Sequence, residues 1–185
     1  MQSRKSAQKA AAALFLIAIG VVIPAFSPLK LLLEPASFTL ASHAPIFIAM
    51  FISPGVTIAV AAGSAVGFFV GGSSQVIILR AASHVLFALL GSCLLDYNPR
   101  IVSSRLRMSV FAAAISVIHA LAEVAVVEVF FMSGGTVSYT YTTSAIWLLI
   151  GLGGFIHSLI DFVIAVAVLK LLTSRASLRS IFIQV

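Results

Sequence analysis

The chain has 185 residues, of which 61% are hydrophobic and only 9% are charged. This composition excludes an ordinary water-soluble globular domain. Apolar stretches approach the ~20 residues that a helix needs to cross a bilayer, so we predict an all-α, multi-pass membrane protein. The stretches lack the polar–apolar alternation of a transmembrane β-barrel. The net charge of +6 does not indicate nucleic-acid binding, because the basic residues neither cluster with aromatic residues nor lie on a soluble face.

Six helical spans are predicted, separated by turns rich in Pro, Gly and Ser. They form one transmembrane domain and cover about residues 7–26, 37–52, 56–70, 75–95, 108–132 and 145–172. The third span carries small residues at four-residue intervals, a pattern that lets another helix approach closely. These residues are Gly63, Gly67 and Gly71.

The distribution of basic residues predicts the orientation. An even number of spans places both termini on one side of the membrane. Lys and Arg are concentrated before the first span, between the fourth and fifth spans, and after the sixth, whereas the opposite side has only Lys30. The positive-inside rule therefore places both termini in the cytoplasm, with segments 27–36, 71–74 and 133–144 outside. The basic residues on the cytoplasmic side are Arg4, Lys5, Lys9, Arg100, Arg105, Arg107, Lys170, Arg175 and Arg179.

Three pairs of ionisable residues interrupt the last three spans. Each pair has a spacing of four residues, so its two side chains share a helical face. Charged residues are costly in lipid and normally face a bundle interior or a water-filled cavity. We therefore expect the pairs to face one another, together with His43, in a pocket open to the outside. The pairs are Arg80 and His84, His119 and Glu123, and His157 and Asp161.

Structural roles are alternatives for each of these residues. Arg80 and Glu123 could form a buried ion pair, and Asp161 could orient His157 on its own helix. His43 could satisfy backbone groups freed by Pro45. We expect His157 and Asp161 to lie at the floor of the pocket, where Asp161 has a structural role.

The residue types suit a small carboxylated ligand, because an arginine offers a planar fork to an anion. A stand-alone proton-coupled transporter is an alternative, since histidine titrates near neutral pH. Histidine with carboxylate can also bind metal, so an intramembrane metal-dependent hydrolase using His157 and Asp161 is another. The spacing loosely resembles CAAX-type intramembrane proteases, but their paired glutamates are missing. No Walker phosphate loop is present, so the chain cannot use ATP by itself.

The whole chain resembles the substrate-binding S components of energy-coupling factor (ECF) vitamin transporters. Residues 36–54 (ASFTLASHAPIFIAMFISP) and 80–84 (RAASH) are similar to the niacin- and pantothenate-type members. The resemblance implies a multi-pass protein of the bacterial cytoplasmic membrane that binds a small water-soluble vitamin and has no enzyme activity, cofactor or metal of its own. It also implies a transmembrane coupling subunit and two cytoplasmic ATPase subunits as partners.

The resemblance also implies roles for particular residues. Arg80 would be the anion clamp, the connection carrying Lys30 and Glu34 would close the pocket as a lid, and the remaining pocket residues would contact the vitamin. These are His43, His84, His119, Glu123 and His157, with Tyr139 and Trp147 as apolar or stacking walls. The family's Ala-xxx-Ala contact with the coupling subunit is only partly present, at Ala7, Ala11 and Ala18. Gly63, Gly67 and Gly71 offer a second surface for that contact.

Overall fold

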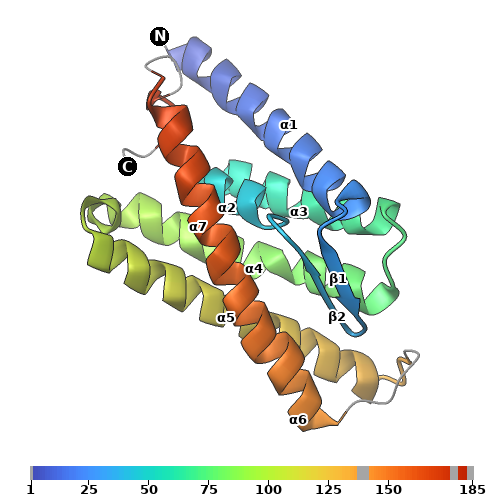
Figure 1. The fold of residues 1–185 in the computed structure, drawn as a ribbon. Helices are drawn as coiled ribbons and strands as arrows, with labels where there is room; N and C mark the ends of the chain where they lie inside the picture. The colour runs from blue at the N-terminus through green and yellow to red at the C-terminus, as the bar shows by residue number, and fades with distance from the viewer. Residues whose placement is uncertain (1, 137–141, 176–178, 183–185) are drawn as a thin grey trace.

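The computed structural model describes residues 2–136, 142–175 and 179–182, and helices dominate them (Figure 1). Four helical stretches are long and apolar enough to cross a membrane, which supports the prediction of an all-α membrane protein. They are α1 (Gln2–Phe26), α4 (Gln75–Tyr97), α5 (Arg105–Met132), and the continuous run of α6 (Thr143–Ile146), the π-helical segment η2 (Trp147–Leu152) and α7 (Gly153–Thr173).

The two remaining helices are shorter. Helix α3 (Pro54–Val70) has 17 residues and begins with a proline in its first turn, where a missing N–H costs nothing. Helix α2 (Ala44–Met50) has only 7 residues, all of them buried. The predicted helix over 37–52 is therefore wrong in its first half, which forms a strand and a turn instead. Hydropathy identified this stretch as apolar but could not distinguish a buried short helix from a span.

A β-hairpin between α1 and α2 was not predicted from the sequence. Strands β1 (Lys30–Leu33) and β2 (Ala36–Thr39) pair antiparallel, with Lys30 opposite Thr39. An isolated two-stranded hairpin is marginal in water, so packing against the bundle must support this one. Strand β2 lies against the protein through its buried residues, and the ring of Phe38 covers Gly153, where an added Cβ would come 2.9 Å from Phe38 Cζ.

The glycine face of α3 packs against α1 within the same chain. A Cβ at Gly67 would lie 2.6 Å from the Cα of Val21, and a Cβ at Gly71 would lie 2.9 Å from the Cα of Ala25. Gly63 similarly accommodates the side chain of Ile17. The expected contact of these three glycines with a coupling subunit is therefore corrected: their missing side chains bring two helices of this chain together.

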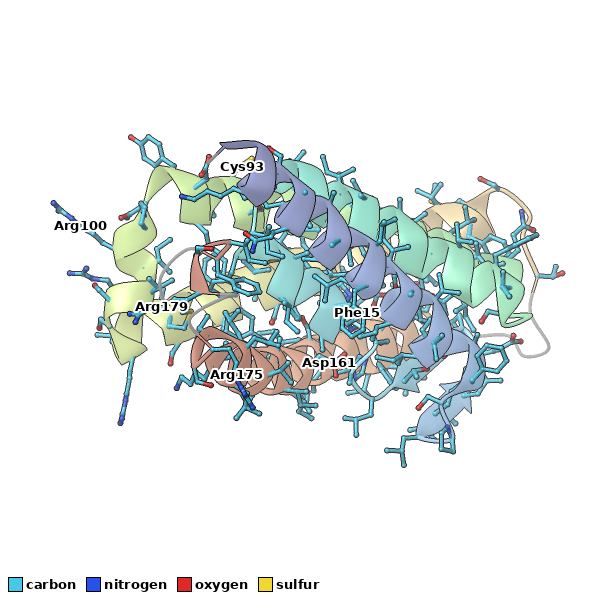
Figure 2. All side chains as sticks on the ribbon, turned by 90° about the horizontal axis from the view of Figure 1, so that it is seen from above. Phe15, Cys93, Arg100, Asp161, Arg175 and Arg179 are labelled. Carbon is cyan, nitrogen blue, oxygen red and sulfur yellow. The ribbon has the colours of Figure 1, made fainter. Side chains whose placement is uncertain are left out.

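The basic segments gather at one end of the bundle. The start of α1, the end of α7 and the short 3₁₀ helix η1 (Pro99–Ser103) between α4 and α5 lie toward the same end, away from the hairpin (Figure 1). Figure 2 shows Arg100, Arg175 and Arg179 together at this end, with Asp161 nearer the middle. This arrangement fits the predicted separation of charge, which assigns the basic end to the cytoplasm.

Candidate functional site: a buried histidine–carboxylate cluster

The three ionisable pairs meet in one buried cluster beneath the hairpin. Helix α4 supplies Arg80 and His84, α5 supplies His119 and Glu123, and α7 supplies His157 and Asp161. The i,i+4 spacing turns each pair inward on one face of its helix. His43, at the start of α2, completes the cluster. Side chains distant in the sequence thus share the interior because a charged group avoids lipid.

Glu123 organises one half of the cluster. Its Oε2 accepts a hydrogen bond of 2.8 Å from Arg80 Nη2, and its Oε1 lies 3.1 Å from His84 Nε2 and 3.5 Å from His119 Nε2. Arg80 Nη1 also donates to the carbonyl oxygen of Pro35, at 2.7 Å. Arg80 and Glu123 are each only 3% exposed, so the pair is shielded from water and ties the hairpin to α4 and α5.

Asp161 organises the other half, mainly through backbone groups. The N–H of Ala41 donates to Asp161 Oδ1 at 2.7 Å, and the N–H of His43 donates to Oδ2 at 2.9 Å. The same Oδ2 lies 2.9 Å from His43 Nδ1 and 3.5 Å from His157 Nε2. Because an ionised carboxylate only accepts hydrogen bonds, Asp161 fixes Nδ1 of His43 as the protonated nitrogen.

His43 joins the two halves. Its Nε2, which points away from Asp161, lies 3.4 Å from His84 Nε2. The ring centroid of His43 lies 4.6 Å from those of His84 and His119 and 5.0 Å from that of His157. The rings of the other three histidines of the chain therefore surround that of His43, and the floor role expected of His157 is shared with His43 and Asp161.

Several buried nitrogen atoms in the cluster lack a hydrogen-bond partner among the described residues. Both ring nitrogens of His119, Nδ1 of His84 and Nε of Arg80 belong to this group. An unsatisfied buried polar group costs about 1–3 kcal/mol, so such atoms normally have a partner. Four ligand atoms, from His43, His84, His119 and Glu123, all lie within 4.8 Å of one another, a grouping that could hold a metal ion.

Little free space remains inside the cluster. The cavity between the hairpin and helices α4, α5 and α7 has a volume of about 10 Å³, which is room for about one water molecule. A larger open groove of about 390 Å³ lies outside it, next to Lys30, Phe38 and His157. The Phe38 ring packs edge-on against His157, with centroids 5.5 Å apart, so these two side chains lie between the groove and the cluster.

Other residues predicted for the site lie elsewhere. Trp147 is half exposed at the start of η2 and does not line the central cavity, which argues against its predicted role as a wall. Tyr139 falls outside the described residues. Lys30 and Glu34 lie on the hairpin, at the start of β1 and in its turn. Ala7, Ala11 and Ala18 lie on the exposed side of α1, where a partner could contact them.

Two contributors were not found from the sequence, Ser42 and the carbonyl of Pro35. Ser42 Oγ lies 3.5 Å from ring nitrogens of both His43 and His157, and its position beside His43 was the only available signal. The carbonyl of Pro35 is a backbone group, which sequence patterns do not identify. Gly154 lets α7 approach α5, since a Cβ there would lie 3.2 Å from Glu123 Oε2.

Comparison with characterised proteins gives one informative match. The chain is 38% identical, over 153 residues, to the niacin transporter NiaX of Lactococcus lactis subsp. cremoris, and the alignment covers 83% of this chain and 69% of the relative. The chain belongs to the family of this transporter. The match confirms the resemblance to niacin-type members, and with the long apolar helices it confirms a multi-pass bacterial membrane protein. No protein-family model and no solved structure matches the chain.

Proposed function

We propose that the chain is the niacin-binding S component of an ECF-type importer. The observation that carries this proposal is the 38% identity to a niacin transporter over most of the chain. The buried cluster supports it, because ionisable residues inside a membrane bundle mark a solute site by default. Of the two vitamins expected from the sequence, niacin rather than pantothenate is the one that the relative transports.

Niacin is a small aromatic ring with one carboxylate and one ring nitrogen. Donors from Arg80 and the histidines suit the carboxylate, and an imidazole can donate to the ring nitrogen. The vitamin would enter from the groove beside the hairpin, where Lys30 supplies a positive charge to attract the anion. In this proposal Lys30 and Glu34, which lie on the hairpin, belong to the lid.

Binding in the cluster requires the hairpin to move, because the cavity of about 10 Å³ is too small for a vitamin. Polar and apolar contacts together hold the hairpin down. They include the bond from Arg80 to the Pro35 carbonyl, the burial of Ala36 and the edge-on contact of Phe38 with His157. A carboxylate that drew Arg80 away from Pro35 would release one of them, which couples ligand binding to movement of the lid.

The partner subunits are part of the same proposal. The outer face of α1 is apolar and exposed, with Leu14, Phe15 and Val22 each more than half exposed. Ala7, Ala11 and Ala18 lie exposed on the same helix, and small residues allow close helix approach. We therefore assign this face to a transmembrane coupling subunit, which two cytoplasmic ATPases would drive. The chain itself is expected to have no enzyme activity.

Equilibrium binding of radiolabelled niacin to the purified chain in nanodiscs tests the vitamin. Niacin should bind more tightly than nicotinamide, which lacks the carboxylate, and more tightly than pantothenate. Arg80→Ala should weaken niacin binding by about 2–5 kcal/mol, the usual cost of removing one partner of a buried charge pair. Glu128→Gln is the control, because Glu128 lies on α5 outside the cluster. Absence of niacin binding, or a preference for pantothenate, would reject the vitamin.

Uptake measurements test the importer. Cells that express the chain alone should not concentrate niacin, whereas cells that also express a coupling subunit and its ATPases should do so. Substituting Ala11 and Ala18 by Leu should abolish the uptake without changing niacin binding. Concentrative uptake by the chain alone, abolished by a protonophore, would instead establish the stand-alone proton-coupled transporter.

A further inference from the structure

We infer that the inner part of the cluster is a binding site for one divalent transition-metal ion, of which Zn²⁺ is the best match. The four ligands are the Nε2 atoms of His43, His84 and His119 and the Oε1 atom of Glu123. This inference departs from the sequence-based expectation that the site holds no metal. It does not rest on the proposed niacin function, because the ligands belong to the chain alone.

Three of the six distances among the ligand atoms are close to those of tetrahedral coordination. Zn²⁺ binds imidazole nitrogen and carboxylate oxygen at about 2.0–2.2 Å, and the edges of such a tetrahedron are about 3.3–3.5 Å long. The corresponding distances are 3.4 Å between His43 and His84, 3.1 Å between His84 and Glu123, and 3.5 Å between His119 and Glu123. All four atoms lie within 4.8 Å of one another. Small side-chain rotations would therefore equalise the edges around an ion.

Hydrogen bonding alone does not explain the arrangement. His119 is fully buried, yet its Nδ1 has no hydrogen-bond partner among the described residues and its Nε2 has only the long 3.5 Å contact with Glu123 Oε1. His43 and His84 present their Nε2 atoms to each other at 3.4 Å, where at most one proton can lie between them. A metal ion would give Nε2 of all three rings a partner at once, which would offset the cost of burying them.

His43 and Glu123 have the second layer of contacts of a metal site, whereas Nδ1 of His84 and Nδ1 of His119 have no hydrogen-bond partner among the described residues. A metal-binding histidine commonly donates its other N–H to a carboxylate, which fixes its tautomer and ring orientation. Asp161 does this for His43, at 2.9 Å from Nδ1, and leaves Nε2 with its lone pair facing the centre. Arg80 holds the other oxygen of Glu123 and so directs Oε1 toward the histidines. The small cavity lined by three of the four ligand residues, His43, His84 and Glu123, has room for about one water-sized particle.

A cation would also change the charge that the cluster offers to a ligand. Without an ion, the two negative charges of Glu123 and Asp161 outnumber the single positive charge of Arg80, so Arg80 attracts a carboxylate against a net negative charge. A divalent ion reverses that balance and makes the site attractive to an anion. If niacin binds here, as proposed above, its carboxylate would complete charge neutralisation.

Metal titration of the full-length, tag-free chain in nanodiscs tests the site, with niacin absent throughout. After treatment with a chelator, the protein should take up one equivalent of Zn²⁺ by elemental analysis. Co²⁺ should produce the intense visible absorption of a tetrahedral site, and Zn²⁺ should raise the unfolding temperature because it binds only the folded state. Because niacin is absent, failure of the proposed function would leave these results unchanged.

Variants decide which residues hold the ion. His119→Gln should weaken Zn²⁺ binding at least a hundredfold and abolish the Co²⁺ spectrum, whereas His157→Gln, outside the four-ligand set, should retain both. His119→Cys should keep the ion with a thiolate-to-cobalt charge-transfer band, which separates loss of a ligand from loss of folding. The inference would be overturned if the wild-type chain held no metal either as purified or after titration with Zn²⁺. It would also be overturned if His119→Gln bound Zn²⁺ as tightly as the wild type, or if His157→Gln lost Zn²⁺ binding to the same extent as His119→Gln.

Discussion

The two carboxylates of the cluster are balanced in different ways. Glu123 faces other side chains, chiefly the guanidinium of Arg80 and two imidazoles. Asp161 faces backbone N–H groups of a single turn, at Ala41 and His43, and one imidazole that it orients. Side chains can rotate toward a ligand or an ion, whereas backbone groups of a fixed turn cannot. We infer that the side chains of the Glu123 half can rearrange around a ligand, whereas Asp161 holds the backbone turn that positions His43.

Removing the Asp161 carboxylate should cause the largest loss of stability. Asp161→Ala leaves two backbone donors and His43 without their acceptor in a fully buried position. Each buried donor left without its acceptor costs about 1–3 kcal/mol, and the three donors to Asp161 together make this the largest expected loss. Asp161→Asn should recover part of the loss, since its amide oxygen can still accept one backbone bond. Thermal unfolding in detergent measures both, and a wild-type unfolding temperature for Asp161→Ala would contradict a framing role.

A double-mutant cycle on Arg80 and Glu123 should show a smaller and partly recoverable loss. Glu123→Gln and Arg80→Met each leave one buried charge unpaired, at about 3–5 kcal/mol per variant. In the double variant neither charge is present, so its destabilisation should fall short of the sum by about 1–3 kcal/mol. Chemical or thermal unfolding of the four proteins gives the coupling. Strict additivity would mean that the 2.8 Å contact contributes nothing to stability.

The close approach of α7 to α5 should have an intermediate effect. A Cβ at Gly154 would lie 3.2 Å from Glu123 Oε2, so Gly154→Ala should displace the carboxylate from Arg80 at about 1–3 kcal/mol, the usual cost of overpacking. Gly151→Ala is the matched control, because its Cβ would meet Trp147 and Val124 at an ordinary 3.6 Å. Equal stability of the two variants would show that the Glu123 carboxylate has room to move.

The sequence predicted the inward-facing pairs but not the turn, short helix and hairpin that hold them in place. A charged residue in an apolar span is a strong signal, because its cost in lipid makes it face the interior of the bundle. This signal identified six of the cluster residues. His43 was included, but the helix predicted around it was wrong, since a short buried helix and a membrane span are both simply apolar. The hairpin depends on its packing against α7, which no local pattern of residues 30–39 reveals.

Substituting Ala41 should have the smallest effect on stability. It tests the backbone turn that donates to Asp161. Ala41 has a φ of 65°, a left-handed conformation that costs a residue with a Cβ roughly 1–2 kcal/mol. Glycine relieves this strain but loses more chain entropy on folding, by roughly 0.5–1 kcal/mol. Ala41→Gly should therefore be neutral or slightly stabilising in thermal unfolding. Ala49→Gly, within α2, is the control and should cost about 1 kcal/mol or more.

Ala41→Gly in the Asp161→Asn background tests whether Asp161 holds the turn at Ala41 in its conformation. If the two backbone bonds to Asp161 hold Ala41 in its strained conformation, weakening these bonds should increase the stability gained when the strain is relieved. Ala41→Gly should then raise the unfolding temperature more in the Asp161→Asn protein than in the wild type. An equal shift in both backgrounds would mean that the conformation at Ala41 is set by the hairpin alone and that Asp161 serves mainly to orient His43.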